Sequence, residues 1–202
     1  MGDPGCTAIE TMQSFLCMPR LRQIEDARLL RAMAHPLRLR LLEALIKDGP
    51  ETASELGRRL DESSGMTSYH LRQLEKYGFV EEDGRHGRKR FWRAVDEGFE
   101  WTTDTDDAGL LEASGALGRQ LVGQYTRWLT RWFAETRHWD RRWRAAAASG
   151  DYWFELTPAE LRELGDEVTA VLKRYEDRRA PRDGTERTIV LFHGFPERRE
   201  AA

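Results

Sequence analysis

Residues 63–95 read SSGMTSYHLRQLEKYGFVEEDGRHGRKRFWRAV, and no other segment says as much about the fold. The first half of this segment carries apolar residues at helical spacing and ends at Gly78, which predicts a helix capped by Ser63 or Ser64. In its second half the period changes to that of two short strands, Phe79–Glu82 and Lys89–Val95, around a glycine-containing turn. The segment therefore predicts a helix followed by a β-hairpin.

Three further helices are predicted before this segment. The first covers Arg22–Ala34, and the second begins with Pro36 at its first helical position and stops at Gly49. The third follows Thr52, which has Glu55 three residues later and so matches a capping box. Helices and a hairpin in this order form a winged helix-turn-helix.

Beyond the hairpin, the sequence predicts a small α+β module. A proline-free helical stretch covers Leu110–Ala148, and strand-like segments follow at Tyr152–Leu156 and Arg187–Phe195. Between them, Thr157-Pro158-Ala159-Glu160 is a strong helix start, and the helix that follows has an apolar face that we expect to be buried. The fold class predicted for the whole chain is mainly α with small β content (α+β).

The sequence predicts that the chain is divided into three parts. We expect a loosely ordered leader (1–20), a winged helix-turn-helix domain (21–100) and a C-terminal dimerisation or sensor domain (101–202). The leader holds the only two cysteines, Cys6 and Cys17, and a structural disulfide is not expected there. No run of about 18 apolar residues and no secretory pattern is present, so no membrane contact is expected and the chain is predicted to be cytoplasmic.

Two surfaces of the predicted domain point to DNA. One side of the helix after Ser63 mixes small, hydroxyl and cationic residues, as a recognition helix in the major groove does: Ser64, Gly65, Ser68, Tyr69, Arg72 and Lys76. The hairpin tip carries cations that suit phosphates beside the minor groove: Arg85, Arg88, Lys89 and Arg90. The net charge of −3 does not oppose this, because the five cations between Gly84 and Val95 have no acidic neighbour there.

The segment Asp26–Trp101 resembles the ArsR-type winged-helix regulators. The resemblance is carried by AHPLRLRLL (34–42), TSYHLRQL (67–74), GFV (78–80) and GRKRFW (87–92). It implies a homodimer on a two-fold operator, usually a repressor released by a signal, and it places His70 near the phosphate backbone. A helix histidine half-buried against the wing is an equal alternative for His70. The C-terminal half resembles, more weakly, the extension of an actinobacterial-type subgroup, which names no ligand.

Metal sensing and catalysis are not expected. Many ArsR-type regulators sense metals through a cysteine pair on the third helix, but here that stretch is Ala53–Gly57 and has no cysteine. His138 and Asp140 lie two apart on a helix and form a poor chelate. The chain shows no recognisable catalytic arrangement and no phosphate-binding glycine loop, so no cofactor and no enzymatic activity are predicted.

Aromatic residues repeat along the long C-terminal helix at Tyr125, Trp128, Trp132 and Trp139. They could form a core, a dimer seam or the wall of a pocket for an unknown small-molecule effector. The function predicted for the chain is sequence-specific, homodimeric transcription regulation on double-stranded DNA. The alternative is a winged-helix protein-interaction module without DNA binding, which usually lacks the wing cations kept here.

Overall fold

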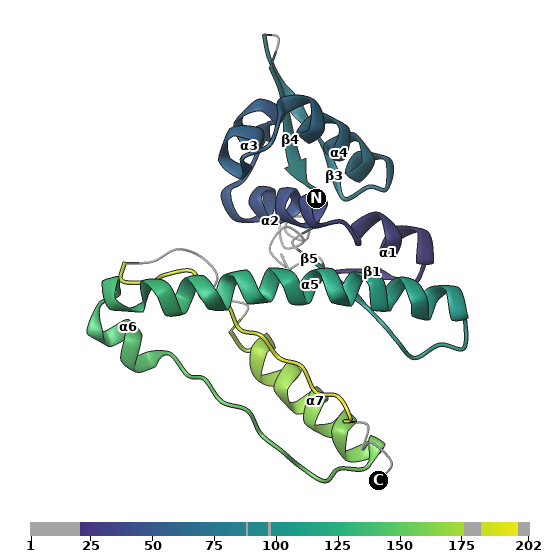
Figure 1. Ribbon diagram of the computed structural model, residues 1–202, viewed down its shortest axis with the longest axis vertical. Coiled ribbons are helices and arrows are strands. Elements are labelled where there is room, and N and C mark those ends of the chain that lie inside the picture. Colours follow the sequence, from purple (N-terminus) through teal and green to yellow (C-terminus); the bar gives the residue numbers. More distant parts are fainter. Residues whose placement is uncertain (1–20, 88, 97, 176–182, 198–202) are drawn as a thin grey trace, which may run out of the picture. The chain divides into compact units, whose positions relative to one another are not determined.

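The computed structural model describes residues 21–87, 89–96, 98–175 and 183–197 (Figure 1). The predicted leader and its two cysteines lie outside these residues. The chain divides into two units, Met1–Trp128 and Leu129–Ala202. The division falls within the long helix α5 (Ala108–Glu135), and the domain limits expected from the sequence stay a prediction.

The N-terminal unit contains four short helices, and each starts after a capping residue. They are α1 (Ala27–Met33), α2 (Pro36–Asp48), α3 (Ala53–Leu60) and α4 (Ser64–Lys76). The side chains of Asp26, Thr52 and Ser63 accept hydrogen bonds from backbone N–H groups that the first helical turns leave unpaired. The predicted start of α2 at Pro36 and the capping box of Thr52 and Glu55 are confirmed.

The helix predicted over Arg22–Ala34 is wrong in its first part. β1 (Leu21–Ile24) pairs in parallel with β5 (Gly98–Trp101), and α1 starts only after Asp26. Ile24 is buried in this arrangement. Because the pairing strand lies far along the chain, the helical spacing of nearby apolar residues could not reveal it.

The wing is a hairpin of β3 (Val80–His86) and β4 (Lys89–Ala94). A short strand, β2 (Glu51–Thr52), pairs with the other edge of β4, so the antiparallel sheet has the order β2-β4-β3. A bulge lies between Glu82 and Gly84, where the φ of Gly84 is +119° and favours glycine. Both predicted hairpin strands, and with them the winged helix-turn-helix, are confirmed, but β3 is longer than predicted and continues through Asp83–His86, which the sequence placed in the turn.

One apolar core joins the helices, the wing and the first part of α5. Its fully buried members include Leu30, Met33, Leu41, Leu56, Leu71, Leu74, Val80 and Leu117, together with Trp92 of the wing. Leu71 and Leu74 face inward, as their spacing predicts. The core therefore fixes α4 and the wing relative to each other, and the predicted α+β fold class is confirmed.

The turn between α3 and α4 depends on a glycine. A Cβ at position 57 would lie 2.8 Å from the carbonyl oxygen of Glu62 and 3.1 Å from Oγ1 of Thr67. Neither neighbour can yield easily, because the first is backbone and the second is buried and donates to the Ser63 carbonyl at 2.9 Å.

We expect Gly57→Ala to lower the free energy of unfolding by about 1–3 kcal/mol, measured by urea denaturation. The matched control is Gly118→Ala in α5, where a Cβ meets nothing within 4 Å. That change should leave stability equal or raise it by up to about 1 kcal/mol, because alanine favours helix. Equal denaturation midpoints for wild type and Gly57→Ala would contradict the close packing of this turn.

The helix predicted over Leu110–Ala148 is broken. α5 ends at Glu135, a 3-10 turn (η1, Thr136–His138) follows, and α6 (Arg141–Ala146) starts after Asp140. The Asp140 carboxylate accepts a hydrogen bond from the Arg142 backbone N–H at 2.7 Å. This side chain therefore caps a new helix in place of continuing the old one, which helical periodicity alone does not disclose.

The C-terminal unit contains α7 (Pro158–Lys173), which starts at the predicted capping box of Thr157 and Glu160. The expectation of a buried apolar face is wrong: residues along it are half-buried or exposed.

The strands predicted at Tyr152–Leu156 and Arg187–Phe195 are also wrong, since both segments are described and neither forms a strand. The second segment runs along α7, where Gly194 lies close to the Leu161 side chain (Figure 1). A strand needs a backbone partner as well as residues that favour strands, and neither segment has such a partner among the described residues.

Candidate nucleic-acid interface

The helix α4 presents one buried face and one exposed face. The buried side chains are Thr67, His70, Leu71 and Leu74. The predicted outer residues Ser64, Gly65, Tyr69, Arg72 and Lys76 are exposed, and Ser68 is partly exposed. The predicted division into faces is confirmed, and His70, which the sequence left open, belongs to the buried face.

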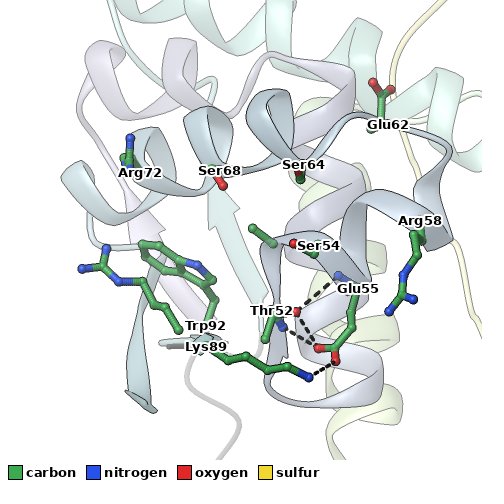
Figure 2. Close-up of a pocket in the computed structure, with 12 residues that line it drawn as sticks. Thr52, Ser54, Glu55, Arg58, Glu62, Ser64, Ser68, Arg72, Lys89 and Trp92 are labelled. Atoms are coloured by element: carbon green, nitrogen blue, oxygen red, sulfur yellow. Dashed lines mark hydrogen bonds and ion pairs between the residues drawn. The ribbon is translucent and has the colours of Figure 1, made fainter. Parts of the chain in front are cut away.

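A groove of about 880 Å³ lies beside the exposed face of α4 (Figure 2). From α4 it is lined by Ser64, Ser68 and Arg72, and from the wing by Lys89, Arg90 and Trp92; the rest comes from β2, α3 and the turn after α3: Thr52, Ala53, Ser54, Glu55, Arg58 and Glu62. The groove thus brings together residues from the recognition helix and the wing, which the sequence identified separately.

The wing cations are partly neutralised within the protein. Lys89 Nζ lies 3.9 Å from the Glu55 carboxylate, and Arg90 Nε lies 2.9 Å from that of Glu82. The Arg90 guanidinium also lies over the Trp92 ring, 5.2 Å from its centroid. Hydrogen bonds from Thr52 hold the pKa of the Glu55 carboxyl below its usual value, with Lys89 adding to the effect. Phosphate would therefore have to compete with these carboxylates.

Two other arginines of the groove have guanidinium groups that are not paired with a described carboxylate. Neither Arg72 of α4 nor Arg58 of α3 forms an ion pair with any residue that the structure describes. Sequence reasoning missed Arg58 and its groove neighbour Ser54. Their signal is that they lie four residues apart in the helix that follows Thr52, which puts both on one exposed side of α3.

Residues 33–83 match a protein-family model described as helix-turn-helix domain. This segment holds α2, α3, α4 and the first part of the wing, and thus most of the residues that line the groove. The N-terminal unit is a winged helix-turn-helix domain. Domains of this kind are the DNA-binding parts of transcription regulators.

Several solved structures are similar to this winged helix-turn-helix chain. Reduced HlyU from Vibrio cholerae is 27% identical, over 45% of this chain and 78% of that chain, with a TM-score of 0.31. The homodimeric winged helix-turn-helix DNA-binding domain of Mb0332 from Mycobacterium bovis, a possible ArsR-family transcriptional regulator, is 19% identical, over 57% and 86%, with a TM-score of 0.33. Disulfide-formed AbfR is 20% identical, over 55% and 82%, with a TM-score of 0.30.

These TM-scores lie below 0.5, so the assignment of the winged helix-turn-helix rests on the family match and on the geometry above. A comparison with curated proteins found no match.

Within the winged helix-turn-helix, His70 is not placed for DNA contact. It is only 6% exposed and faces inward, where its ring meets that of His35. We therefore remove His70 from the residues predicted to touch DNA. Arg88 lies outside the described residues; Arg85 lies opposite Arg90 in the hairpin ladder, and only its backbone is described.

The aromatic residues of α5 fall into two groups. Tyr125 packs against the core of the winged helix-turn-helix. Trp128 donates its indole N–H to Glu43 of α2 at 2.9 Å, and the same carboxylate accepts from buried Gln124 at 2.6 Å. These contacts give Tyr125 and Trp128 a role in attaching α5 to α2.

Trp132 and Trp139 belong to the C-terminal unit, and their ring centroids lie 6.1 Å apart. Both rings are half-buried. Whether they form a dimer seam or the wall of an effector pocket stays a prediction.

None of the described helices has the length and apolar character that crossing a membrane requires. Within residues 21–87, 89–96, 98–175 and 183–197, no group of three or more histidine, cysteine, aspartate or glutamate side chains is arranged to hold a metal ion.

Proposed function

We propose that this protein is a sequence-specific DNA-binding transcription regulator that acts as a homodimer on a near-palindromic operator. The observation that carries the proposal is the groove shared by α3, α4 and the wing, lined by Ser68 and Arg72 on one side and by Lys89 and Arg90 on the other. This arrangement fits a recognition helix in the major groove with a wing beside it.

Each part of this surface has a separate role in the proposal. Ser64 and Gly65 lie at the N-terminal end of α4, where the backbone can approach the DNA closely and hydroxyls can reach base edges or phosphates. Arg72, further along the same face, offers a guanidinium for a guanine edge. Lys76 lies in the last turn and suits the phosphate backbone. The wing cations, Arg85 and Arg88 included, add affinity without reading sequence.

The remaining parts of the proposal follow from this DNA-binding role. A two-fold dimer would place two recognition helices about 34–36 Å apart, one turn of DNA. We further propose that the protein represses transcription in the cytoplasm, has no catalytic role and does not sense metals, because α3 lacks the cysteines used for that purpose. A small-molecule effector is left open.

The deciding experiment measures binding of the full chain to labelled DNA from upstream of its own locus. Fluorescence anisotropy should show tight, salt-sensitive binding to one segment and binding weaker by roughly a thousandfold or more to shuffled DNA of equal length. Footprinting should reveal two half-sites related by a two-fold axis. Equal, weak binding to both DNAs would reject sequence-specific regulation and favour a winged-helix protein-interaction module.

Replacing Arg88, Lys89 and Arg90 together by alanine should weaken binding to every DNA sequence and flatten its salt dependence. Removal of one cation–phosphate interaction should reduce the slope of log K against log salt by about 0.9. The measured reduction of the slope should be smaller than three times this value, because Lys89 and Arg90 also form ion pairs with Glu55 and Glu82.

The matched control for this triple variant replaces three exposed cations of α6, Arg141, Arg142 and Arg144, and removes the same charge. An unchanged slope in the wing variant, or an equal change in the control, would exclude the wing from DNA contact.

A further inference from the structure

A pair of histidines lies beneath the recognition helix. His35 is the N-cap of α2, and its Nδ1 accepts a hydrogen bond from the Leu37 backbone N–H at 3.2 Å. His70 lies in the middle of α4 on its buried face, and the centroids of the two rings are 4.3 Å apart. The pair therefore connects the start of α2 with the inner side of α4.

We propose that this pair positions α4 for DNA binding only while both imidazoles are neutral, so that acidification releases the operator. The proposal rests on the DNA-binding function proposed above and adds a regulation to it. Both histidines act as positioning residues, because neither lies on the exposed face of α4.

Hydrogen bonding requires the neutral rings. Nδ1 of His35 carries no proton while it accepts from Leu37, and a proton there would turn this acceptor into a donor and remove the cap of α2. Nδ1 of His70 is buried without a hydrogen-bond partner among the described residues. An imidazolium has two N–H donors, so protonated His70 would leave one of them unsatisfied in the interior.

Burial and the neighbouring cations also favour the neutral form of both histidines. Burial is the largest cause that lowers the pKa of both His35 and His70, and the Arg38 guanidinium of α2 lowers both pKa values further. His35 itself also lowers the pKa of His70. Glu62, in the turn between α3 and α4, opposes these effects, but it also lies 3.6 Å from Arg40. Protonation would thus place two further cations beside Arg38, on one buried and one half-buried ring, with Glu62 as the carboxylate that acts on both.

Tyr69 connects the pair to the exposed face of α4. Its ring meets that of His70 edge-on, with centroids 5.1 Å apart, and 55% of its surface is exposed. Tyr69 and Tyr77 are also the phenols that interact with Arg38. A displacement of protonated His70 would therefore move a side chain of the DNA-facing surface.

A DNA affinity that falls as the pH falls is unusual for a DNA-binding protein. Gaining histidine cations in acid ordinarily strengthens attraction to phosphates. Here the folded state holds the pKa of both histidines below the usual value of about 6.5, so the unfolded chain takes up protons first. The stability of the α4 anchor is complete above that pH and declines as the pH falls through the lowered pKa values.

The test compares operator affinity at about pH 7.5 and about pH 5.5 at constant ionic strength, by fluorescence anisotropy. Wild-type affinity should fall by roughly tenfold or more. The double variant His35→Asn/His70→Phe should lose this dependence, because asparagine still caps α2 and phenylalanine fills the same space without titrating. His138→Gln, at an exposed site in the C-terminal unit, is the matched control and should keep the wild-type decline.

Affinity that is constant or rises in acid, or an equal decline in the double variant, would overturn the proposal. A second measurement needs neither DNA nor a variant: NMR titration of the histidine rings, with hydrogen exchange of the α4 amides. Ring pKa values at or above the usual value, or α4 protection that does not fall in acid, would also overturn it. If the protein binds no DNA at any pH, the proposed function fails, and this DNA-free measurement still decides whether the pair is an acid-sensitive anchor.

Discussion

Replacing Trp92 by alanine is expected to lower the free energy of unfolding by about 3–5 kcal/mol. The side chain is only 2% exposed and belongs to the core that holds the wing against the helices. Trp92 also lies on the central strand of the sheet, opposite Glu51 of β2 and Glu82 of β3. Its removal leaves a large cavity between sheet and helices, and urea denaturation followed by circular dichroism measures the effect.

The control for this variant is another tryptophan. Trp153 is 76% exposed, so Trp153→Ala should change the free energy of unfolding of the N-terminal unit by less than about 0.5 kcal/mol. Trp92→Phe should fall between the two, because it keeps part of the buried apolar surface. Equal destabilisation by Trp92→Ala and Trp153→Ala would contradict the placement of Trp92 in the core.

Replacing Arg72 by alanine is expected to weaken operator binding by about 1–3 kcal/mol, or roughly fivefold to 150-fold. Arg72 is exposed in the groove and has no ion-pair partner in the described part of the chain, so its guanidinium is free for a base edge. Anisotropy titrations should show that affinity falls most on the best operator and little on altered half-sites, so that discrimination is relaxed.

Arg162→Ala provides the matched control, because Arg162 is an exposed arginine on α7, outside the groove. It should change the affinity by less than about twofold. Arg90→Ala should cost less than Arg72→Ala, because Arg90 is already paired with Glu82. A uniform decrease on all DNA sequences would make Arg72 a phosphate-binding residue, and no decrease would exclude it from the interface.

Local sequence signals were sufficient for most of the winged helix-turn-helix. The Thr52–Glu55 capping box and the Pro36 start act within a single helical turn, so their outcome does not depend on the rest of the fold. The same holds for the exposed position of Arg72, which follows from helical spacing once Leu71 and Leu74 are buried. The strands of the wing were predictable because a short turn joins them.

Errors arose where partners are distant or where a side chain competes with the helix. β1 pairs with β5 from the other end of the domain, and Asp140 caps a new helix within a helical pattern. In the C-terminal unit, the strand-like, aromatic-rich segment Tyr152–Leu156 suggested a strand, yet no described backbone pairs with it.

The amino-acid sequence alone was enough for the helix–turn–helix–hairpin order and for the exposed positions of the α4 residues that we propose to face DNA, because capping, helical period and turn chemistry are local. The three-dimensional arrangement was needed to show that Lys89 and Arg90 are held by carboxylates, that Arg58 joins Arg72 in one groove, and that His70 turns inward to meet His35. These features escape the sequence because ion pairing, groove formation and burial depend on which elements the core brings together. Periodicity shows which face of a helix a residue is on, but not what that face meets.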